Sequence, residues 1–236
     1  RGMETVYHKW NSDIALLSGD TMLIKAFQFA LNTNKKYSHE IFTELCKVAL
    51  EVCEGQQYDL NFETLDNVSI DSYIEMIRLK TAVLLGSVLK IGAIVAETSE
   101  KNKQDIYNFG INLGLAFQLQ DDIFDCYGDV NIFGKMTGGD ISDNKKTFLY
   151  LKALELADEE DRNTLIELFK MPKGRDEKKI QRVLDIYSKY NIREIVNDLM
   201  TDYYERSLSN LNDIDVADYK KEILKNYTDY LYKRNK

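Results

Sequence analysis

The sequence predicts an all-α protein, and three observations support that fold class. Proline occurs once in 236 residues, at Pro172, and glycine occurs 12 times, so the strongest helix breakers are scarce. Apolar residues recur at spacings of three and four, as in Ile195, Leu199 and Tyr203, which places them on one helix face. Alternating strand patterns are hard to find. We therefore expect residues 1–236 to form a single domain, a bundle of long helices.

The apolar period and local start and stop signals predict the individual helices. In chain order their ranges are 11–32, 38–54, 69–97, 102–127, 145–157, 159–170, 176–188, 192–210 and 215–234. Ser69 and Asp71 suit the N-cap or first turn of the third helix. Gly55 suits the end of the second helix, because glycine is common just past a helix terminus. The clearest break is "MPKGRDE" at 171–177, where proline, glycine and charges occur together.

Composition and charge exclude several classes of function. The net charge of −8, from 31 basic and 39 acidic residues, argues against general nucleic-acid binding, which needs clustered Lys and Arg. The only histidines are His8 and His39, and the three cysteines, Cys46, Cys53 and Cys126, form no CxxC pair. Neither a zinc site nor a disulfide framework is therefore expected. Free thiols fit a reducing compartment, so we predict a cytoplasmic protein.

The longest uncharged segment is "IYNFGINLGLAFQLQ", fifteen residues from Ile106 to Gln120. It contains Asn108, Asn112 and two glutamines, and no run in the chain reaches the roughly 18 apolar residues of a membrane span. We therefore expect no integral membrane segment. Its apolar residues spread around the whole helix, which predicts a helix surrounded by protein.

Three aspartates end this uncharged helix, in "FQLQDDIFDCYGD": Asp121, Asp122 and Asp125. Residues four apart share a helix face, so Asp121 and Asp125 point the same way, whereas Asp122 is rotated by about 100°. An arbitrary DDxxD is most often a solvated acidic helix end, but buried carboxylates need cations. Oxygen donors without histidine or thiolate suit Mg²⁺, with Mn²⁺ as an alternative, and Mg²⁺ usually bridges to substrate phosphates.

The next twenty residues, "GDVNIFGKMTGGDISDNKKT", supply what a phosphate site needs. Four glycines allow the backbone to approach a ligand closely. Lys135, Lys145 and Lys146 can offset the charge of a diphosphate, and Thr147 opens the following helix. A glycine-rich loop alone is a weak signal, but the combination with the aspartates indicates a metal and diphosphate site.

The pattern "FQLQDDIFD..GD....GK..GGD....KKT" resembles the second aspartate-rich region of the trans-isoprenyl diphosphate synthases, the polyprenyl synthetases that include farnesyl and geranylgeranyl diphosphate synthases. "EGQ" at 54–56 resembles the Gly-Gln motif of this family, and "YIEMIRLKTAVLL" at 73–85 resembles its Lys-Thr helix. Residues 1–23 resemble the segment after its first aspartate-rich motif. The resemblance spans most of the chain and implies a single all-α bundle around a central cavity.

The resemblance implies a prenyltransferase that joins isopentenyl diphosphate to an allylic diphosphate. The allylic diphosphate ionises, the isopentenyl double bond attacks the carbocation, and a proton is lost. The implied product is a short-chain trans-prenyl diphosphate, C15–C20, and the implied cofactor is Mg²⁺. Members of the family are usually homodimers, so a homodimer is expected here.

The resemblance also assigns roles to single residues. Asp121 matches the directly ligating aspartate of the metal motif, and Asp122 and Asp125 match the other two, one or both acting through water. The positions that match diphosphate-binding residues are Arg1, Lys80, Lys135 and Lys145. Lys145 is preferred to Lys146 because the family pattern is lysine, any residue, threonine.

Three further matches concern the reacting carbons. Thr81 and Gln118 match polar residues that stabilise the cation by their dipoles. Phe117 matches an aromatic residue near the isopentenyl unit, although a role in the core explains it equally well. Asp140 is expected to organise the lysine loop.

The family carries its first aspartate-rich motif just before the position that matches Arg1. We therefore expect the domain to be N-terminally incomplete, with one half of the metal site in this chain. Two alternatives stay open: a class I terpene cyclase, whose second metal motif normally differs, and a non-catalytic regulatory subunit. An intact DDxxD upstream of Arg1 would favour catalysis.

Overall fold

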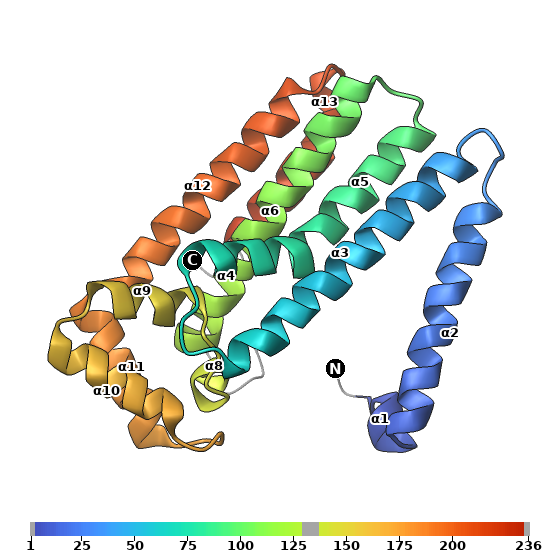
Figure 1. The fold of residues 1–236 in the computed structure, drawn as a ribbon. Coiled ribbons are helices and arrows are strands. Elements are labelled where there is room, and N and C mark those ends of the chain that lie inside the picture. The colour runs from blue at the N-terminus through green and yellow to red at the C-terminus, as the bar shows by residue number, and fades with distance from the viewer. Residues whose placement is uncertain (1–2, 129–136, 234–236) are drawn as a thin grey trace.

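The computed structural model describes residues 3–128 and 137–233, and every regular element in these ranges is a helix (Figure 1). The predicted all-α class is therefore confirmed. The elements are α1 (Val6–Lys9), α2 (Ser12–Leu31), α3 (Ser38–Thr64), α4 (Ile70–Ile77), the π-helical turn η1 (Arg78–Ala82), α5 (Val83–Val95), α6 (Glu100–Tyr127), α8 (Gly139–Ser142), α9 (Phe148–Leu156), α10 (Glu159–Lys170), α11 (Glu177–Lys189), α12 (Ile192–Asp213) and α13 (Asp218–Lys233). Arg1 and Lys135, two predicted site residues, lie outside the described residues.

The long helices α3, α5, α6 and α12 run side by side, and α13 lies behind α6 (Figure 1). Helix α6 packs against both α5 and α12, so it is the centre of the bundle. The short helices α8 to α11 gather at the end of the bundle where α6 terminates (Figure 1). The aspartates at the end of α6 therefore face a layer of short helices and loops.

Helix α6 is buried around most of its circumference, as its uncharged sequence predicts. Ile106, Phe109, Leu113, Ala116 and Leu119 are all buried. The N-cap of this helix is Ser99, whose side chain accepts a hydrogen bond from the backbone N–H of Asn102. At the third predicted helix Ser69 is the N-cap in the same way, because its hydroxyl satisfies an N–H group that the first helical turn leaves unpaired.

Gly55 does not end the second predicted helix. Helix α3 continues to Thr64, and Gly55 is buried in its interior. A Cβ atom at position 55 would lie 2.3 Å from the backbone nitrogen of Lys80. The glycine is therefore required for the close approach of α3 to η1, and the interpretation as a helix end was wrong.

The predicted helix 69–97 is divided into three parts by the π-helical turn η1. Such turns insert one residue into an α-helix and are frequent at functional sites. Here η1 contains Lys80 and Thr81. The spacing of apolar residues in the sequence did not predict this π-helical turn.

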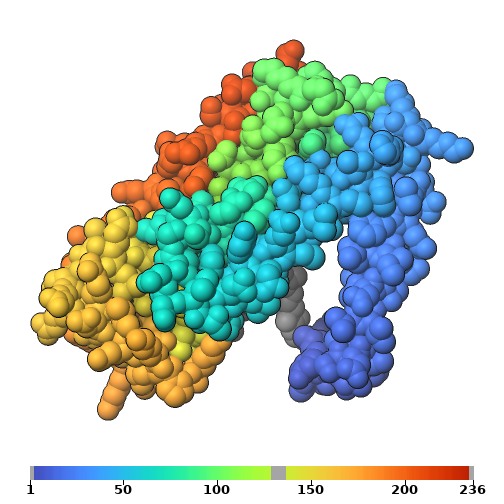
Figure 2. All heavy atoms as spheres, in the orientation of Figure 1, coloured from blue at the N-terminus to red at the C-terminus, as the bar shows by residue number. Residues whose placement is uncertain are grey.

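One helix among the described residues, α2, is long and apolar enough to cross a membrane by length and composition. Its mean hydropathy is 1.4 over a window that is only 6% buried. Polar residues such as Ser18 and Thr21 interrupt its apolar runs, which is why the sequence gave no such candidate. Figure 2 shows α2 standing away from the bundle along most of its length. Leu17 and Phe29 on it are 61% and 73% exposed.

The packing of α6 on η1 predicts opposite effects for two glycine substitutions. A Cβ atom at Gly114 would lie 2.6 Å from the Cα of Ala82, whereas one at the exposed Gly92 of α5 would meet nothing within 4 Å. We expect Gly114→Ala to lower the free energy of unfolding by about 1–3 kcal/mol. Gly92→Ala should raise it by roughly 0.5–1 kcal/mol. Urea denaturation measures both, and equal effects would contradict the proposed close contact.

Candidate active site

Five chain segments meet around a polar cavity of about 90 Å³ at the C-terminal end of α6. They are the end of α3, helix α4, the turn η1, the end of α6, and the segment from α8 to the start of α9. This volume holds several water molecules at roughly 10–15 Å³ each. Four of the residues predicted from the sequence line the cavity, namely Lys80, Gln118, Asp122 and Lys145.

Lys80 enters the cavity from η1 and forms an ion pair with Asp59 of α3, with an N–O distance of 2.6 Å. Asp59 also lines the cavity. Because Gly55 lets α3 touch the backbone of Lys80, the same helix can bring Asp59, one turn further on, to its side chain. The Gly-Gln motif therefore contributes to the geometry of the lysine.

Thr81 and Gln118 lie together, and the threonine hydroxyl donates to Oε1 of Gln118 at 3.2 Å. Gln118 in turn donates from Nε2 to Asp122 at 3.4 Å. Thr81 does not line the polar cavity. It lines a second, apolar cavity of about 310 Å³ together with Phe117 and with Leu231 of α13. Gln118, in the lining of the polar cavity, is thus hydrogen-bonded to a residue in the lining of the apolar cavity.

The carboxyl group of Asp122 is the most buried acid of the site, with 3% of the residue exposed. The Tyr73 hydroxyl donates a hydrogen bond to one oxygen, and Gln118 donates to the other. Burial raises the pKa of Asp122 to about 7, and the charges of Asp140 and Asp121 add to this effect. Its two oxygens are already occupied by protein donors.

Asp125 and Lys145 are joined through Asp140. The backbone N–H of Asp140 donates to Asp125 at 2.8 Å, and the Asp140 carboxylate pairs with the Lys145 ammonium at 2.8 Å. Gly139 permits this approach, since a Cβ there would lie 2.9 Å from an oxygen of Asp125. Burial, followed by the charge of Asp140, raises the pKa of Asp125.

Lys146 has a different position from Lys145. Its ammonium group donates to the carbonyl oxygens of Phe62, at 2.9 Å, and Leu65 at the C-terminus of α3. A lysine there satisfies carbonyl groups that lack helical partners. The side chain of Lys145 is half exposed and, among the residues that the structure describes, forms its ion pair with a carboxylate that also lines the cavity. The geometry therefore agrees with the preference for Lys145 as the ligand-binding lysine.

Within the described ranges, no group of three or more His, Cys, Asp or Glu side chains is arranged to hold a metal ion by itself. The chemistry of the cluster nevertheless fits a cation. Asp121, Asp122 and Asp125 offer only oxygen donors, and like charges contribute to the raised pKa values of the latter two. Mg²⁺ typically binds one or two carboxylates together with substrate phosphates, so a magnesium site does not require three protein ligands.

Sequence reasoning missed Asp59 and Tyr73, the cavity residues that bond to Lys80 and Asp122. Asp59 follows Gly55 by four residues, so the shared helix face was a usable signal. Tyr73 gave none, because a tyrosine in an amphipathic helix predicts only packing. The predicted organiser Asp140 does contact Lys145.

Comparisons with known proteins agree with this geometry. The family model described as polyprenyl synthetase matches residues 1–187. A short chain isoprenyl diphosphate synthase of Methanocaldococcus jannaschii is 36% identical over 188 residues, which cover 79% of this chain and 57% of the relative. The chain thus spans less than two thirds of the length of that relative.

Two solved structures are similar over nearly the whole chain. The crystal structure of a geranylgeranyl pyrophosphate synthase is 38% identical, has a TM-score of 0.91, and is matched over 100% of this chain and 73% of its own. A polyprenyl synthase of Caulobacter crescentus CB15, complexed with calcium and isoprenyl diphosphate, is 25% identical with a TM-score of 0.82, over 96% and 67% of the two chains.

The buried Asp122 predicts a pH dependence of stability. Its pKa rises from 3.8 in the unfolded chain to about 7 in the folded protein, so the folded state binds the proton more tightly. Its contribution to the free energy of unfolding therefore falls as the pH rises from about 4 to about 7 and stays low above that. We expect Asp122→Asn to gain on the order of 2 kcal/mol relative to wild type between pH 5 and pH 8.

Urea denaturation in the presence of a chelator measures this difference. Asp185→Asn, at an exposed aspartate of α11, is the matched control and should follow the wild-type curve. Parallel curves for wild type and Asp122→Asn would mean that Asp122 ionises normally in the folded protein.

Proposed function

Because the chain belongs to the polyprenyl synthetase family, we propose that it carries the second aspartate-rich metal and diphosphate site of a trans-prenyltransferase. The proposed reaction joins isopentenyl diphosphate to an allylic diphosphate and yields a short-chain trans-prenyl diphosphate, C15–C20. The relative from Methanocaldococcus jannaschii, named as a short chain isoprenyl diphosphate synthase, supports this class of product.

One observation carries the proposal: Gln118, which lines the polar cavity, accepts a hydrogen bond from Thr81, which lines the apolar cavity. An allylic diphosphate has an anionic head and a hydrocarbon tail. Lys80 and Lys145 suit the head, and the cavity beside Thr81 and Phe117 suits the tail. The bond that breaks would then lie at the junction of the two.

The chemistry proposed for these residues is electrostatic. As the carbon–oxygen bond of the allylic diphosphate breaks, negative charge grows on the leaving group, where Lys80 and Lys145 can stabilise it. The oxygen dipoles of Thr81 and Gln118 lie where they can face the allylic cation. The isopentenyl double bond then supplies the electron pair, and a proton leaves the new chain. No nucleophilic side chain takes part.

Divalent metal binding is proposed for the aspartates at the end of α6. Asp121 and Asp125 are the candidates for direct ligands, whereas Asp122, with both oxygens bonded to Tyr73 and Gln118, suits a supporting position. Mg²⁺, or Mn²⁺ in its place, would supply positive charge for the leaving diphosphate. The Caulobacter crescentus protein, which is complexed with calcium and isoprenyl diphosphate, supports the use of a divalent ion.

The two alternative functions are less well supported. A class I terpene cyclase would not account for the lysines that converge with the aspartates, Lys80 and Lys145. A regulatory subunit has no need for the lysines and carboxylates that line the cavity. The names of the relatives also favour a synthase.

We also infer that the protein is a cytoplasmic homodimer in which a second copy covers α2. The exposed side chains of this helix include Leu16, Leu17 and Phe29. A membrane is the other way to cover them, but Asp20 and Lys25 lie in the middle of the helix, where a bilayer would make their charges costly. A protein partner can leave such groups in water.

The activity is tested with the protein expressed from its complete gene, incubated with Mg²⁺, isopentenyl diphosphate and allylic primers of different lengths. We expect Mg²⁺-dependent elongation, and the longest product defines the product class. Lys145→Met should lower kcat/KM for the allylic primer by about 10²-fold, as loss of one charge-stabilising group typically does.

Lys152→Met is the control, since Lys152 pairs with Glu155 on α9 and does not line the cavity. It should leave the rate within about twofold of wild type. Absence of elongation with every primer would reject the proposed reaction, and equal rates for the two variants would reject the role of Lys145.

The homodimer is tested by sedimentation of the wild type and of Leu17→Glu. A charge at an apolar contact is expected to convert the dimer to a monomer, because it would be buried without a partner. Asn163→Glu, at an exposed polar position of α10, adds the same charge away from α2 and should stay dimeric. A monomeric wild type would contradict the inference.

A further inference from the structure

Asn144, the residue directly before Lys145, adopts a backbone conformation that few side chains tolerate. Its φ angle is 57°, in the left-handed region, which asparagine enters more readily than other non-glycine residues. The turn reverses the chain between Asp140 and Lys145, so the backbone N–H of Lys145 can donate to the carbonyl oxygen of Asp140 at 2.9 Å. The direction in which Lys145 leaves the backbone depends on this turn.

The Asn144 side chain is held at both ends by residues that are distant in the chain. Its Nδ2 donates to the carbonyl oxygen of Met171 at 2.7 Å. Its Oδ1 accepts a hydrogen bond from the ammonium group of Lys179 on α11. A side chain held on both sides cannot rotate freely, which keeps the left-handed turn in place.

Lys179 is an unusual partner for a neutral amide, because it is 2% exposed. Among the described residues, no carboxylate lies within salt-bridge distance of its ammonium group, and the charges of Asp176 and Asp143 act from further away. The ammonium lies 5.5 Å from the ring centre of Phe169. Burial lowers its pKa. Burying an ammonium group is costly, so its contact with Asn144 needs an explanation beyond packing.

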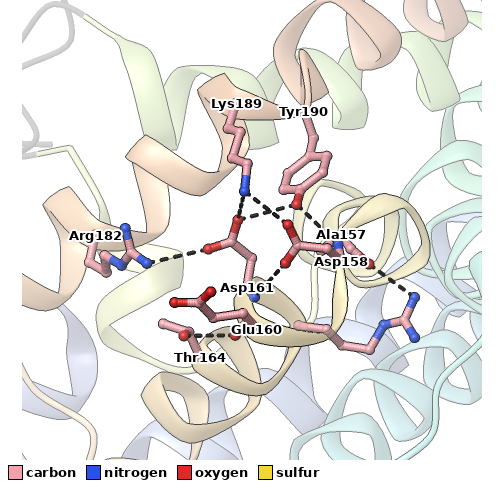
Figure 3. A network of polar contacts seen from close by, with 9 residues as sticks. Ala157, Asp158, Glu160, Asp161, Thr164, Arg182, Lys189 and Tyr190 are labelled. Atoms are coloured by element: carbon pink, nitrogen blue, oxygen red, sulfur yellow. Dashed lines mark hydrogen bonds and ion pairs between the residues drawn. The ribbon is translucent and has the colours of Figure 1, made fainter.

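Helix α11, which carries Lys179, is itself fixed at its other end. Figure 3 shows the buried carboxylate of Asp161 on α10 receiving three donors. Lys189 reaches it at 2.6 Å, the Tyr190 hydroxyl at 3.2 Å and Arg182 at 3.3 Å. Helices α10 and α11 are therefore joined by a network of charged side chains. This network fixes the position of α11, which carries Lys179.

The N-terminal end of α11 also holds the start of the same segment. Arg175 donates to the carbonyl oxygen of Thr137 at 3.0 Å. Gly138 has a φ angle of 81° and lies so close to Ile180 that a Cβ atom would be 2.9 Å from its side chain. Residues 137–147 thus contact α11 at Gly138 and Asn144, and contact Arg175, just before α11, at Thr137.

From this geometry we propose that Asn144 and Lys179 are positioning residues that hold the backbone of Lys145 so that its ammonium group points at Asp140 and the polar cavity. Lysine side chains are long and flexible, so a fixed backbone is what limits their reach. The inference rests on the proposed function only where it concerns diphosphate. If Asn144 and Lys179 only stabilised the fold, their effect on diphosphate binding would not depend on Lys145. The second experiment below distinguishes that structural role from a positioning role.

The first experiment measures hydrogen–deuterium exchange of peptides covering 137–147 in the whole protein. Lys179→Met keeps the apolar stem and removes the donor, and Asn144→Gly keeps the left-handed turn and removes the amide. Both should speed exchange there by about tenfold, the effect of one lost charge-assisted hydrogen bond. The exposed neighbour variant Lys178→Met should leave it unchanged. Unchanged exchange in Lys179→Met and Asn144→Gly overturns the proposal.

The second experiment measures binding of inorganic diphosphate with Mg²⁺ by calorimetry in a double-mutant cycle. Lys179→Met should weaken binding by about tenfold in the wild-type background and by less than about twofold in Lys145→Ala, because its effect passes through Lys145. Equal losses in both backgrounds overturn the proposal. If the wild type binds no diphosphate, the proposed function fails, and the exchange experiment alone decides whether the pair positions the loop.

Discussion

The site depends on one packing constraint, the contact of two helices with the backbone of the π-helical turn η1. Gly55 of α3 meets the backbone nitrogen of Lys80, and Gly114 of α6 meets Ala82 from another helix, at distances that exclude any side chain. Because protein interiors cannot absorb an added methyl group without displacement, both helices and the turn are fixed relative to one another. This contact therefore fixes the positions of Lys80 and Thr81, which lie in that turn.

The charges of the site are arranged in pairs that a ligand would have to rearrange. Lys80 pairs with Asp59, and Lys145 pairs with Asp140. An anionic head group that draws the lysines away would leave two carboxylates without partners, in a cavity that already contains Asp122. A divalent cation entering with the anion would compensate for that loss. The raised pKa of Asp122 has burial as its main cause and neighbouring carboxylates as a smaller one, which agrees with a site that is short of positive charge.

The spacing of apolar residues and the helix start and stop residues predicted most of the helices. They did not predict how the helices pack around the site. The observed bounds of helix α10 agree with the predicted range 159–170, because Asp158 caps its first turn and a proline follows its end. The meaning of Gly55 was misread, since glycine serves equally as a helix end and as a contact point, and only the tertiary structure decides between them. The turn η1 could not be predicted for the same reason. Lys145 was preferred to Lys146 by resemblance alone, and its physical reason, that Lys146 binds the carbonyl groups at the end of α3, needs coordinates.

Gln118 connects these parts. It belongs to the uncharged stretch of α6 yet accepts from Thr81 and donates to Asp122, so both functions of its amide are used. An amide oriented from both sides cannot turn to follow a ligand, and its oxygen dipole is set before any charge develops. Such preorganisation is most effective where a reaction separates charge, because no reorientation is required at that moment. The contact between Gln118, in the lining of the polar cavity, and Thr81, in the lining of the apolar cavity, is therefore a place where separation of an anion from a hydrocarbon cation would be stabilised.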